Sequence, residues 1–180
     1  MIYFSLLRGI NVSGQKKIQM AKLKLLYDSL GFQNVTTYIQ SGNVIFESND
    51  KDCDILSERI SQKILDTFGF EVTVIIRTKD EWIKVIKNNP FAGKAEIDQT
   101  RLYITFLHQE PDEIDADGLD QSKSKTEKYA IVGKEFYFYC PDGYGRTKLS
   151  NTFVEKKLKV TATTRNWNTV NKLLEMTDNK

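Results

Sequence analysis

Apolar residues along the first 78 positions alternate between two spacings, and this alternation restricts the fold more than any other feature of the chain. Four short apolar or β-branched runs are typical of strands: 2–7, 35–40, 44–46 and 70–77. Between these runs, the apolar residues of 20–30 and of 56–68 recur at helical spacing. The resulting order, β-α-β-β-α-β, is that of a split β-α-β unit of the ferredoxin-like type.

The second half of the chain repeats this order less clearly, and the two halves share no residue-level repeat in the sequence. Four further strands are expected at 102–107, 129–132, 136–140 and 159–161. The acidic stretch 110–119 is expected to form a short helix or turn. Thr152 and Glu155 have the spacing of a capping box that opens another short helix, and Thr164 is expected to cap the last helix.

We therefore expect an α+β fold with two ferredoxin-like (β-α-β-β-α-β) subdomains, a linking helix and a C-terminal helix. The first subdomain covers 1–78. The linking helix and a linker cover 79–100, because Thr78 and Glu81 form a capping box and the stretch around Pro90 and Gly93 has little periodicity. The second subdomain and the C-terminal helix cover 101–180.

The cysteine and histidine counts exclude several classes of protein. Two cysteines cannot build a disulfide framework, and together with the single His108 they cannot supply the four ligands of a zinc site. The apolar runs are too short to span a bilayer, and residues 1–7 lack the basic segment that opens a signal peptide. We expect a cytoplasmic monomer with no cofactor, no metal and no membrane contact.

The loop after the first strand is the first candidate site. It carries Arg8, Asn11, Lys16 and Lys17 among small residues, and a helix begins near position 20. Small residues let backbone amides approach an anion, and the cations add charge. The glycine spacing is not that of a P-loop. The alternative is a long basic connection whose glycines only serve turns.

A second candidate lies at 142–150, where Arg146 and Lys148 precede an expected helix start. These cations and nearby amides suit a phosphate, although a β-to-α turn explains the same residues. Arg165 and Asn166 are expected in the first turn of the last helix. The helix dipole disfavours a cation there, so Arg165 is best explained if it meets an anion or a carboxylate.

The charges are segregated along the chain although they nearly cancel overall. Residues 8–24 contain basic residues and no acid, residues 110–120 contain six acids and no base, and residues 121–172 contain eleven bases and four acids. A basic face of this kind could attract a phosphate-bearing partner. The alternative, which we favour from the sequence, is that acidic and basic stretches neutralise each other or are solvated.

Other motifs give little support for catalysis or base stacking. The aromatic run 136–139 suits a half-buried strand better than an RNA-recognition sheet, because Glu135 stands where that motif needs a glycine. His108 is the only histidine, and neither Cys53 nor Cys140 has a basic neighbour in sequence that would lower its pKa. Hydrolytic and redox chemistry are not expected.

Five segments together resemble the bacterial family known as domain of unknown function 1697. They are Leu6-Leu7-Arg8-Gly9-Ile10-Asn11-Val12, Tyr38-Ile39-Gln40-Ser41-Gly42-Asn43-Val44, Asn89-Pro90-Phe91, Gly143-Tyr144-Gly145-Arg146-Thr147-Lys148-Leu149 and Ala162-Thr163-Thr164-Arg165-Asn166-Trp167-Asn168-Thr169-Val170. Ser13 departs from the pattern, because members often carry a second glycine there. The resemblance implies a compact cytoplasmic bacterial protein with ferredoxin-like subdomains. It implies no activity, cofactor or catalytic residue.

The leading hypothesis is a non-catalytic binder of a phosphate-bearing ligand, either a nucleic acid or a phosphorylated metabolite. Its candidate ligand-binding residues are Arg8, Asn11, Lys16, Lys17, Asn43, Arg146, Lys148, Arg165 and Asn166. One alternative is an enzyme acting on a small phosphorylated or acyl-phosphate substrate, with Arg8 and Asn43 as a working pair like that of the ferredoxin-like acylphosphatases. Another is an interaction module whose basic face binds an acidic protein.

Overall fold

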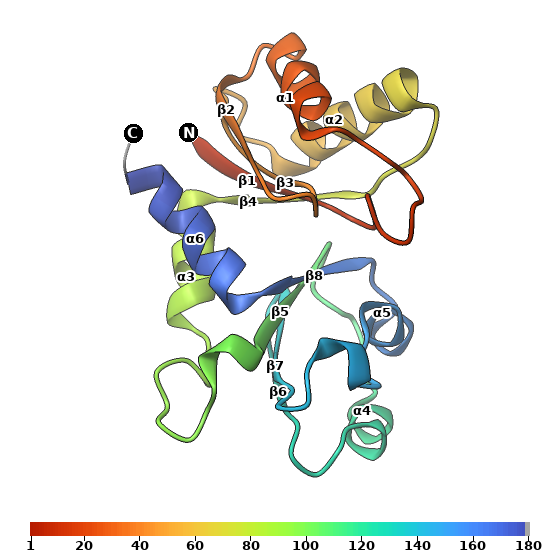
Figure 1. Cartoon of the computed structure of the whole chain (residues 1–180), viewed down its shortest axis with the longest axis vertical. Helices are drawn as coiled ribbons and strands as arrows, with labels where there is room; N and C mark the ends of the chain where they lie inside the picture. Colours follow the sequence, from red (N-terminus) through yellow and green to blue (C-terminus); the bar gives the residue numbers. More distant parts are fainter. Residues whose placement is uncertain (179–180) are drawn as a thin grey trace. The chain divides into compact units, whose positions relative to one another are not determined.

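The computed structural model describes residues 1–178, and the chain divides into two compact units (Figure 1). Unit 1 contains Met1–Lys84 and the chain from Leu173 onward, and unit 2 contains Val85–Lys172. The division therefore falls inside two helices rather than only in a linker. The expected division at 78 and 101 differs from it because these two helices each begin in one unit and end in the other.

Unit 1 contains a four-stranded antiparallel sheet with the strand order β2-β3-β1-β4. Its elements are β1 (Ile2–Leu7), α1 (Met20–Ser29), β2 (Gln33–Tyr38), β3 (Asn43–Glu47), α2 (Cys53–Phe68), β4 (Val74–Thr78) and the first part of α3 (Lys79–Lys87). Apolar residues of α1 and α2 pack with alternate residues of the strands, such as Tyr3, Leu7 and Phe46, in one buried cluster. The two helices therefore cover one face of this sheet (Figure 1).

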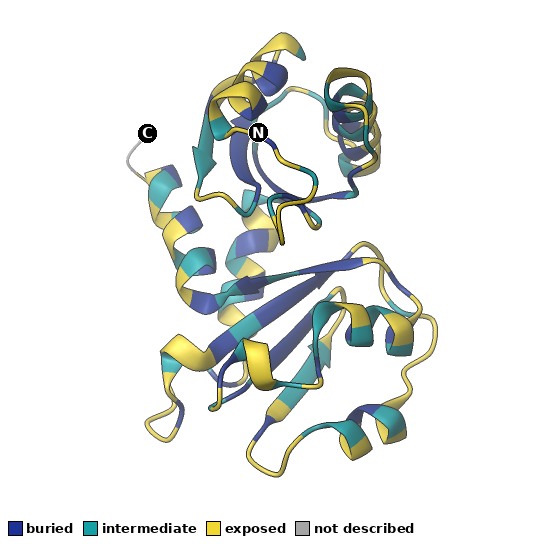
Figure 2. Cartoon of the chain, turned by 45° about the vertical axis from the view of Figure 1, so that its right-hand side comes forward, coloured by how far each residue is buried: buried dark blue, intermediate teal, exposed yellow. Residues whose placement is uncertain are grey.

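Unit 2 contains a second antiparallel sheet of four strands, in the order β6-β7-β5-β8. Its elements are η1 (Gln99–Arg101), β5 (Leu102–Leu107), α4 (Ala116–Ser122), β6 (Lys128–Val132), β7 (Glu135–Tyr139), η2 (Tyr144–Arg146), α5 (Asn151–Leu158), β8 (Ala162–Asn166) and the first part of α6 (Trp167–Asp178). Leu119 of α4 and Val154 of α5 pack on Phe136 and Phe138. In each unit, buried residues line the sheet and the inward sides of its helices (Figure 2).

The two sheets match residue by residue, which the sequence did not indicate. Tyr3 of β1 lies opposite Thr78 and stacks on Phe46, and Tyr103 of β5 lies opposite Asn166 and stacks on Phe138. Both ring pairs have centroids 5.4 Å apart. The expected α+β architecture of two similar subdomains is confirmed.

The start of the last helix was predicted wrongly. Residues 159–161 do not form the last strand; β8 occupies Ala162–Asn166, and Thr164 lies within it. Consecutive threonines resemble a helix cap in sequence, but β-branched residues also suit a strand, and here pairing with β5 decides the outcome. Helix α6 begins at Trp167, and the side chain of Asn166 accepts a hydrogen bond from the amide of Asn168.

The capping boxes had different outcomes. The one at Thr78 is confirmed, because the Thr78 amide donates to Glu81 at 2.8 Å and the Glu81 amide donates to the Thr78 hydroxyl at 3.2 Å. The one at Thr152 is wrong, since Ser150 caps α5 by accepting from the Phe153 amide. The Glu155 carboxylate instead accepts a hydrogen bond from the Ala162 amide at 2.7 Å and so ties α5 to β8.

Candidate functional site

Residues 8–17, called the basic loop below, fold back on themselves as a small hairpin. The amide of Gln15 donates to the carbonyl of Val12 at 2.9 Å, and the amide of Asn11 donates to Lys16 at 3.2 Å. The two residues at the tip, Ser13 and Gly14, both have positive φ, at 50° and 77°. Two consecutive residues with positive φ are typical of a tight hairpin turn, so this loop has a defined conformation.

Asn11 joins the basic loop to the neighbouring turn between β2 and β3. Its side-chain amide donates to the carbonyls of Ile18 at 3.0 Å and Gln40 at 2.8 Å. Its side-chain oxygen accepts from the Ile18 amide at 2.9 Å. Because these bonds use the donors and the acceptor of the side chain, Asn11 holds the loop in place and is poorly suited to bind a ligand directly.

The turn at 38–43 lies at the same end of the sheet and is packed tightly against the basic loop. Gly42 has φ of 76°, and a β-carbon there would lie 2.7 Å from Ile10 and 2.8 Å from Leu7. Asn43 is fully buried, and its side-chain amide donates to the Tyr38 carbonyl and the Ser41 hydroxyl, each at 3.0 Å. Asn43 therefore closes the turn from inside and has no exposed surface for a ligand.

The three cations of the basic loop have different surroundings. Arg8 is half-buried, and its backbone amide donates to Thr73. The Lys16 ammonium donates to the carbonyl of Glu71 at 2.7 Å, whereas Lys17 is exposed. Within residues 1–178, neither lysine forms an ion pair. A neutral carbonyl does not cancel the charge of an ammonium, so this loop keeps a local positive charge.

The second candidate group, in unit 2, gains an arginine that the sequence analysis missed. Arg146 and Lys148 are exposed next to η2. Gly143 has φ of 91°, and a β-carbon there would lie 2.9 Å from Nη1 of Arg101. The missing side chain thus lets the Arg101 guanidinium lie against the 142–146 segment. Arg101 stands directly before the expected strand 102–107, and a basic residue at this border was the sequence signal that could have found it.

Tyr144 fixes this second group to the core of unit 2. Its ring lies 5.2 Å from that of Tyr103 and 6.0 Å from that of Phe138, measured between centroids. Its hydroxyl oxygen accepts a hydrogen bond from the Asn151 amide at 2.9 Å, in the first turn of α5. The tyrosine between the two glycines therefore anchors the loop, while Arg146 and Lys148, which follow it in sequence, stay exposed.

Arg165 lies in β8 and not in a helical turn. It is buried, and its Nη1 donates to the Thr163 hydroxyl and the Thr164 carbonyl, both at 2.8 Å. Burial lowers the pKa of Arg165 to about 10. Arg77, a residue the sequence analysis did not select, is its counterpart in β4, because Arg77 is also buried and donates to the carbonyl of the preceding residue, Ile76.

Asn166 is likewise used within the protein. Its side-chain amide donates to the Thr100 carbonyl at 3.1 Å and its oxygen caps α6. Of the nine predicted residues, the structure brings together five at one end of the unit 1 sheet, namely Arg8, Asn11, Lys16, Lys17 and Asn43. The other four belong to unit 2. Intramolecular bonds account for Asn11, Asn43, Arg165 and Asn166 in their present positions.

The acidic stretch of unit 2 is neutralised by lysines of α5 and the residue after it. Lys157 pairs with Asp115 at 2.7 Å, and Lys159 pairs with Glu113 at 3.1 Å. Hydrogen bonds from Lys157 and from the Gly118 amide, together with the charge of Lys157, hold the pKa of the Asp115 carboxyl below its usual range. These pairs agree with the interpretation that acidic and basic stretches neutralise each other. In unit 1, Lys24 of the basic stretch also pairs with Asp28, at 2.7 Å, whereas Lys16 and Lys17 have no carboxylate partner among the described residues.

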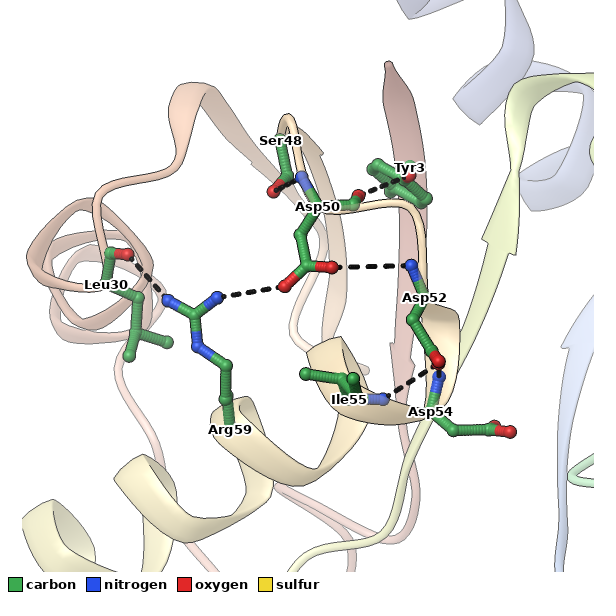
Figure 3. Close-up of polar contacts among 8 residues, drawn as sticks. All are labelled: Tyr3, Leu30, Ser48, Asp50, Asp52, Asp54, Ile55 and Arg59. Carbon is green, nitrogen blue, oxygen red and sulfur yellow. Dashed lines mark hydrogen bonds and ion pairs between the residues drawn. The ribbon is translucent and has the colours of Figure 1, made fainter.

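A surface pocket of about 260 Å³ lies beside the first turns of α2 and was not anticipated. Arg59 reaches from α2 to the carboxylate of Asp50 at 3.4 Å and to the carbonyl of Leu30 at 3.3 Å (Figure 3). Its guanidinium lies 5.5 Å from the centroid of the Phe32 ring. The Arg59 guanidinium therefore already has a carboxylate partner, unlike the lysines of the basic loop.

The remaining candidates for chemistry are buried or dispersed. Burial raises the pKa of the Cys140 thiol to about 12, and it also raises that of Cys53. No group of three or more potential metal ligands occurs among the described residues. Phe136, Tyr137 and Phe138 are buried, so that Tyr139 alone in the run 136–139 has a partly exposed ring, too little for a surface that stacks RNA bases. None of the described helices is long and apolar enough to cross a membrane.

Comparisons with known proteins address the fold and the family. No curated protein matches the chain. The solved structure of the conserved bacterial protein SP0830 from Streptococcus pneumoniae is similar to it, with a TM-score of 0.71, 23% sequence identity and coverage of 97% of each chain. This similarity shows the fold alone. A sequence profile of the family described as "Protein of unknown function (DUF1697)" matches residues 1–137, and the chain therefore belongs to that family.

Proposed function

We propose that the protein binds a phosphate-bearing ligand through the basic loop of unit 1. The observation that carries this proposal is the positive charge of Lys16 and Lys17, which no carboxylate among the described residues pairs with. The loop that carries them is held in one conformation by Asn11, so its cations are positioned before a ligand arrives. Preorganised cations lose less conformational entropy on binding than mobile ones do.

The predicted residues divide into two roles in this proposal. Arg8, Lys16 and Lys17 contact the phosphate, while Asn11 and Asn43 hold the loop and the adjacent turn. In unit 2, Arg146 and Lys148 form a second basic group together with Arg101. Asn166 supports that group through its bond to the Thr100 carbonyl, next to Arg101, and Arg165 is bonded within β8.

Binding without catalysis accounts for the geometry better than turnover of an acyl phosphate does. That reaction would need the Asn43 amide at the substrate, but this side chain is fully buried and donates to Tyr38 and Ser41. An acidic protein is the remaining alternative partner. A cytoplasmic location and a monomeric state stay predictions from the sequence.

Calorimetric titration of the full chain with inorganic polyphosphate tests the proposal. With about three cations in contact, affinity should fall about 20- to 40-fold between ~50 and ~200 mM salt, because phosphate contacts release counterions. Lys17→Ala should weaken binding several-fold. Lys51→Ala, at an exposed lysine of the same unit, is the control and should leave it unchanged. Absence of binding at low salt, or equal effects of the two variants, would refute the proposal.

A further inference from the structure

Two aliphatic side chains are exposed beside the basic loop. Val12, on the first limb of the hairpin, is 59% exposed, and Ile39, in the turn between β2 and β3, is 49% exposed. Asn11 precedes Val12 and Gln40 follows Ile39. Because the Asn11 side chain donates to the Gln40 carbonyl, Val12 and Ile39 lie on neighbouring loops that are fixed to each other. Neither of them contributes to the core of unit 1.

The backbone at Ile39 is unusual for its residue type. Its φ is 50°, in the left-handed region that β-branched residues rarely adopt. An asparagine or glycine would adopt this conformation at less cost, and a polar side chain would suit the exposed position better. Residues held in such conformations cluster at functional sites. An exposed isoleucine in this turn is therefore better explained by a contact outside the chain than by the needs of the fold.

We propose that Val12 and Ile39 contact the bases of a single-stranded nucleic acid whose phosphates meet Arg8, Lys16 and Lys17. This inference rests on the proposed function, since it names the ligand class of the same loop. A nucleotide unit carries an anionic group and a flat apolar group at fixed separation, which matches cations beside aliphatic side chains. Contact between an aliphatic side chain and the face of an unstacked base removes apolar surface of both from water.

A single strand fits this surface better than a duplex or a membrane does. The bases of a duplex are stacked inside it, whereas those of a single strand can turn towards protein side chains while the backbone follows the cations. Two aliphatic side chains offer too little apolar area for membrane attachment, which takes an amphipathic helix face or lipid chains. Along a bound single strand, Arg8, Lys16 and Lys17 would face the phosphates of successive nucleotides.

The test compares one double variant with matched controls, using the full chain. Val12→Thr keeps the shape of the side chain, and Ile39→Asn suits the left-handed backbone, so the double variant V12T/I39N removes apolar surface without straining the loop. The control V132T/I55N alters two other exposed aliphatic side chains, Val132 at 42% and Ile55 at 48% exposure. Fluorescence anisotropy measures binding of a labelled 12-nucleotide single-stranded RNA, and inorganic polyphosphate and a duplex DNA serve as comparison ligands.

V12T/I39N should weaken RNA binding about tenfold, a loss of the size found when a base loses its stacking partner, and should leave polyphosphate affinity within twofold. The control should change neither. The inference is overturned if RNA affinity is unaffected, if polyphosphate affinity falls equally, or if the duplex binds as tightly as the single strand. Binding of polyphosphate without RNA would refute this inference and keep the proposed function, and binding of neither would refute both.

Discussion

The loop that follows the first strand differs between the two units in the sign of its charge and in what those charges contact. In unit 1 the loop after β1 carries Arg8, Lys16 and Lys17 and no acid. In unit 2 the loop after β5 carries acids and no lysine or arginine, and two of its carboxylates, Glu113 and Asp115, pair with Lys159 and Lys157. The sheets beneath the two loops match in register.

The two loops therefore use their charges differently: the carboxylates of the unit 2 loop form ion pairs within the protein, whereas the lysines of the unit 1 loop remain available to a ligand. In unit 2, the ion pairs of Asp115 with Lys157 and of Glu113 with Lys159 fix the loop after β5 to the end of α5. The unit 1 loop is instead held by neutral hydrogen bonds from Asn11, and its lysines are left without carboxylate partners among the described residues. Because a matching sheet in unit 2 carries a loop whose charges are paired, the fold does not require the unpaired lysines of the unit 1 loop.

The largest effect is expected from the glycines in the two equivalent hairpin turns. Gly42→Ala should lower the free energy of unfolding by about 3 kcal/mol, because its β-carbon would overlap Ile10 and Leu7 at a positive φ. Gly133→Ala, where φ is 57° and no atom lies within 4 Å, should cost only about 1 kcal/mol. Urea denaturation measures both. Equal losses would show that the turn of unit 1 is not packed against its loop as described.

A smaller loss is expected at Asn11. Asn11→Ala removes three hydrogen bonds that close the basic loop and should destabilise the protein by about 2 kcal/mol. Asn11→Gly, which adopts the observed φ of 55° easily, separates the hydrogen bonds from the backbone conformation. Thermal unfolding measures the stability of both variants. If the glycine variant were as stable as the wild type, hydrogen bonding by Asn11 would not be what holds this loop.

Two strands that were predicted correctly and one that was missed show what the sequence could and could not predict. The strands at 2–7 and 102–107 were predicted at their observed bounds, because each is an apolar run that ends abruptly at a polar residue. The strand at 162–166 was missed, because only its pairing with β5 distinguishes a run of threonines from a helix cap.

The sequence likewise pointed to the loops and strand ends in which the candidate site residues lie, but it did not predict what their side chains contact. Asn11 was predicted to bind a ligand, yet its side chain contacts Gln40, which lies 29 positions away in the sequence. Asn43 and Arg165 were chosen for their polarity, although each is buried by its place in a sheet. Which polar groups a fold uses internally depends on contacts distant in sequence, and periodicity does not reveal these contacts.

The smallest effect concerns the ion pair of the unit 2 loop. The hydrogen bond from Lys157 lowers the pKa of Asp115, so the ionised pair adds stability above the ordinary carboxyl pKa, and this is lost as pH falls through the lowered value. Lys157→Met should raise this pKa towards its ordinary range, although the Gly118 amide still donates to the carboxylate at 2.8 Å, as NMR titration of the Asp115 carboxyl carbon would show. An unchanged pKa in this variant would mean that Lys157 does not neutralise the loop.

The most direct test of the central claim is an NMR titration of the isotope-labelled full chain with inorganic polyphosphate. The amide signals of the basic loop, residues 8–17, should shift in a saturable manner, while those of the acidic loop at 108–115 should not move. A second set of shifts near Arg101, Arg146 and Lys148 would report the other basic group. Saturating shifts elsewhere with none in residues 8–17 would contradict the account.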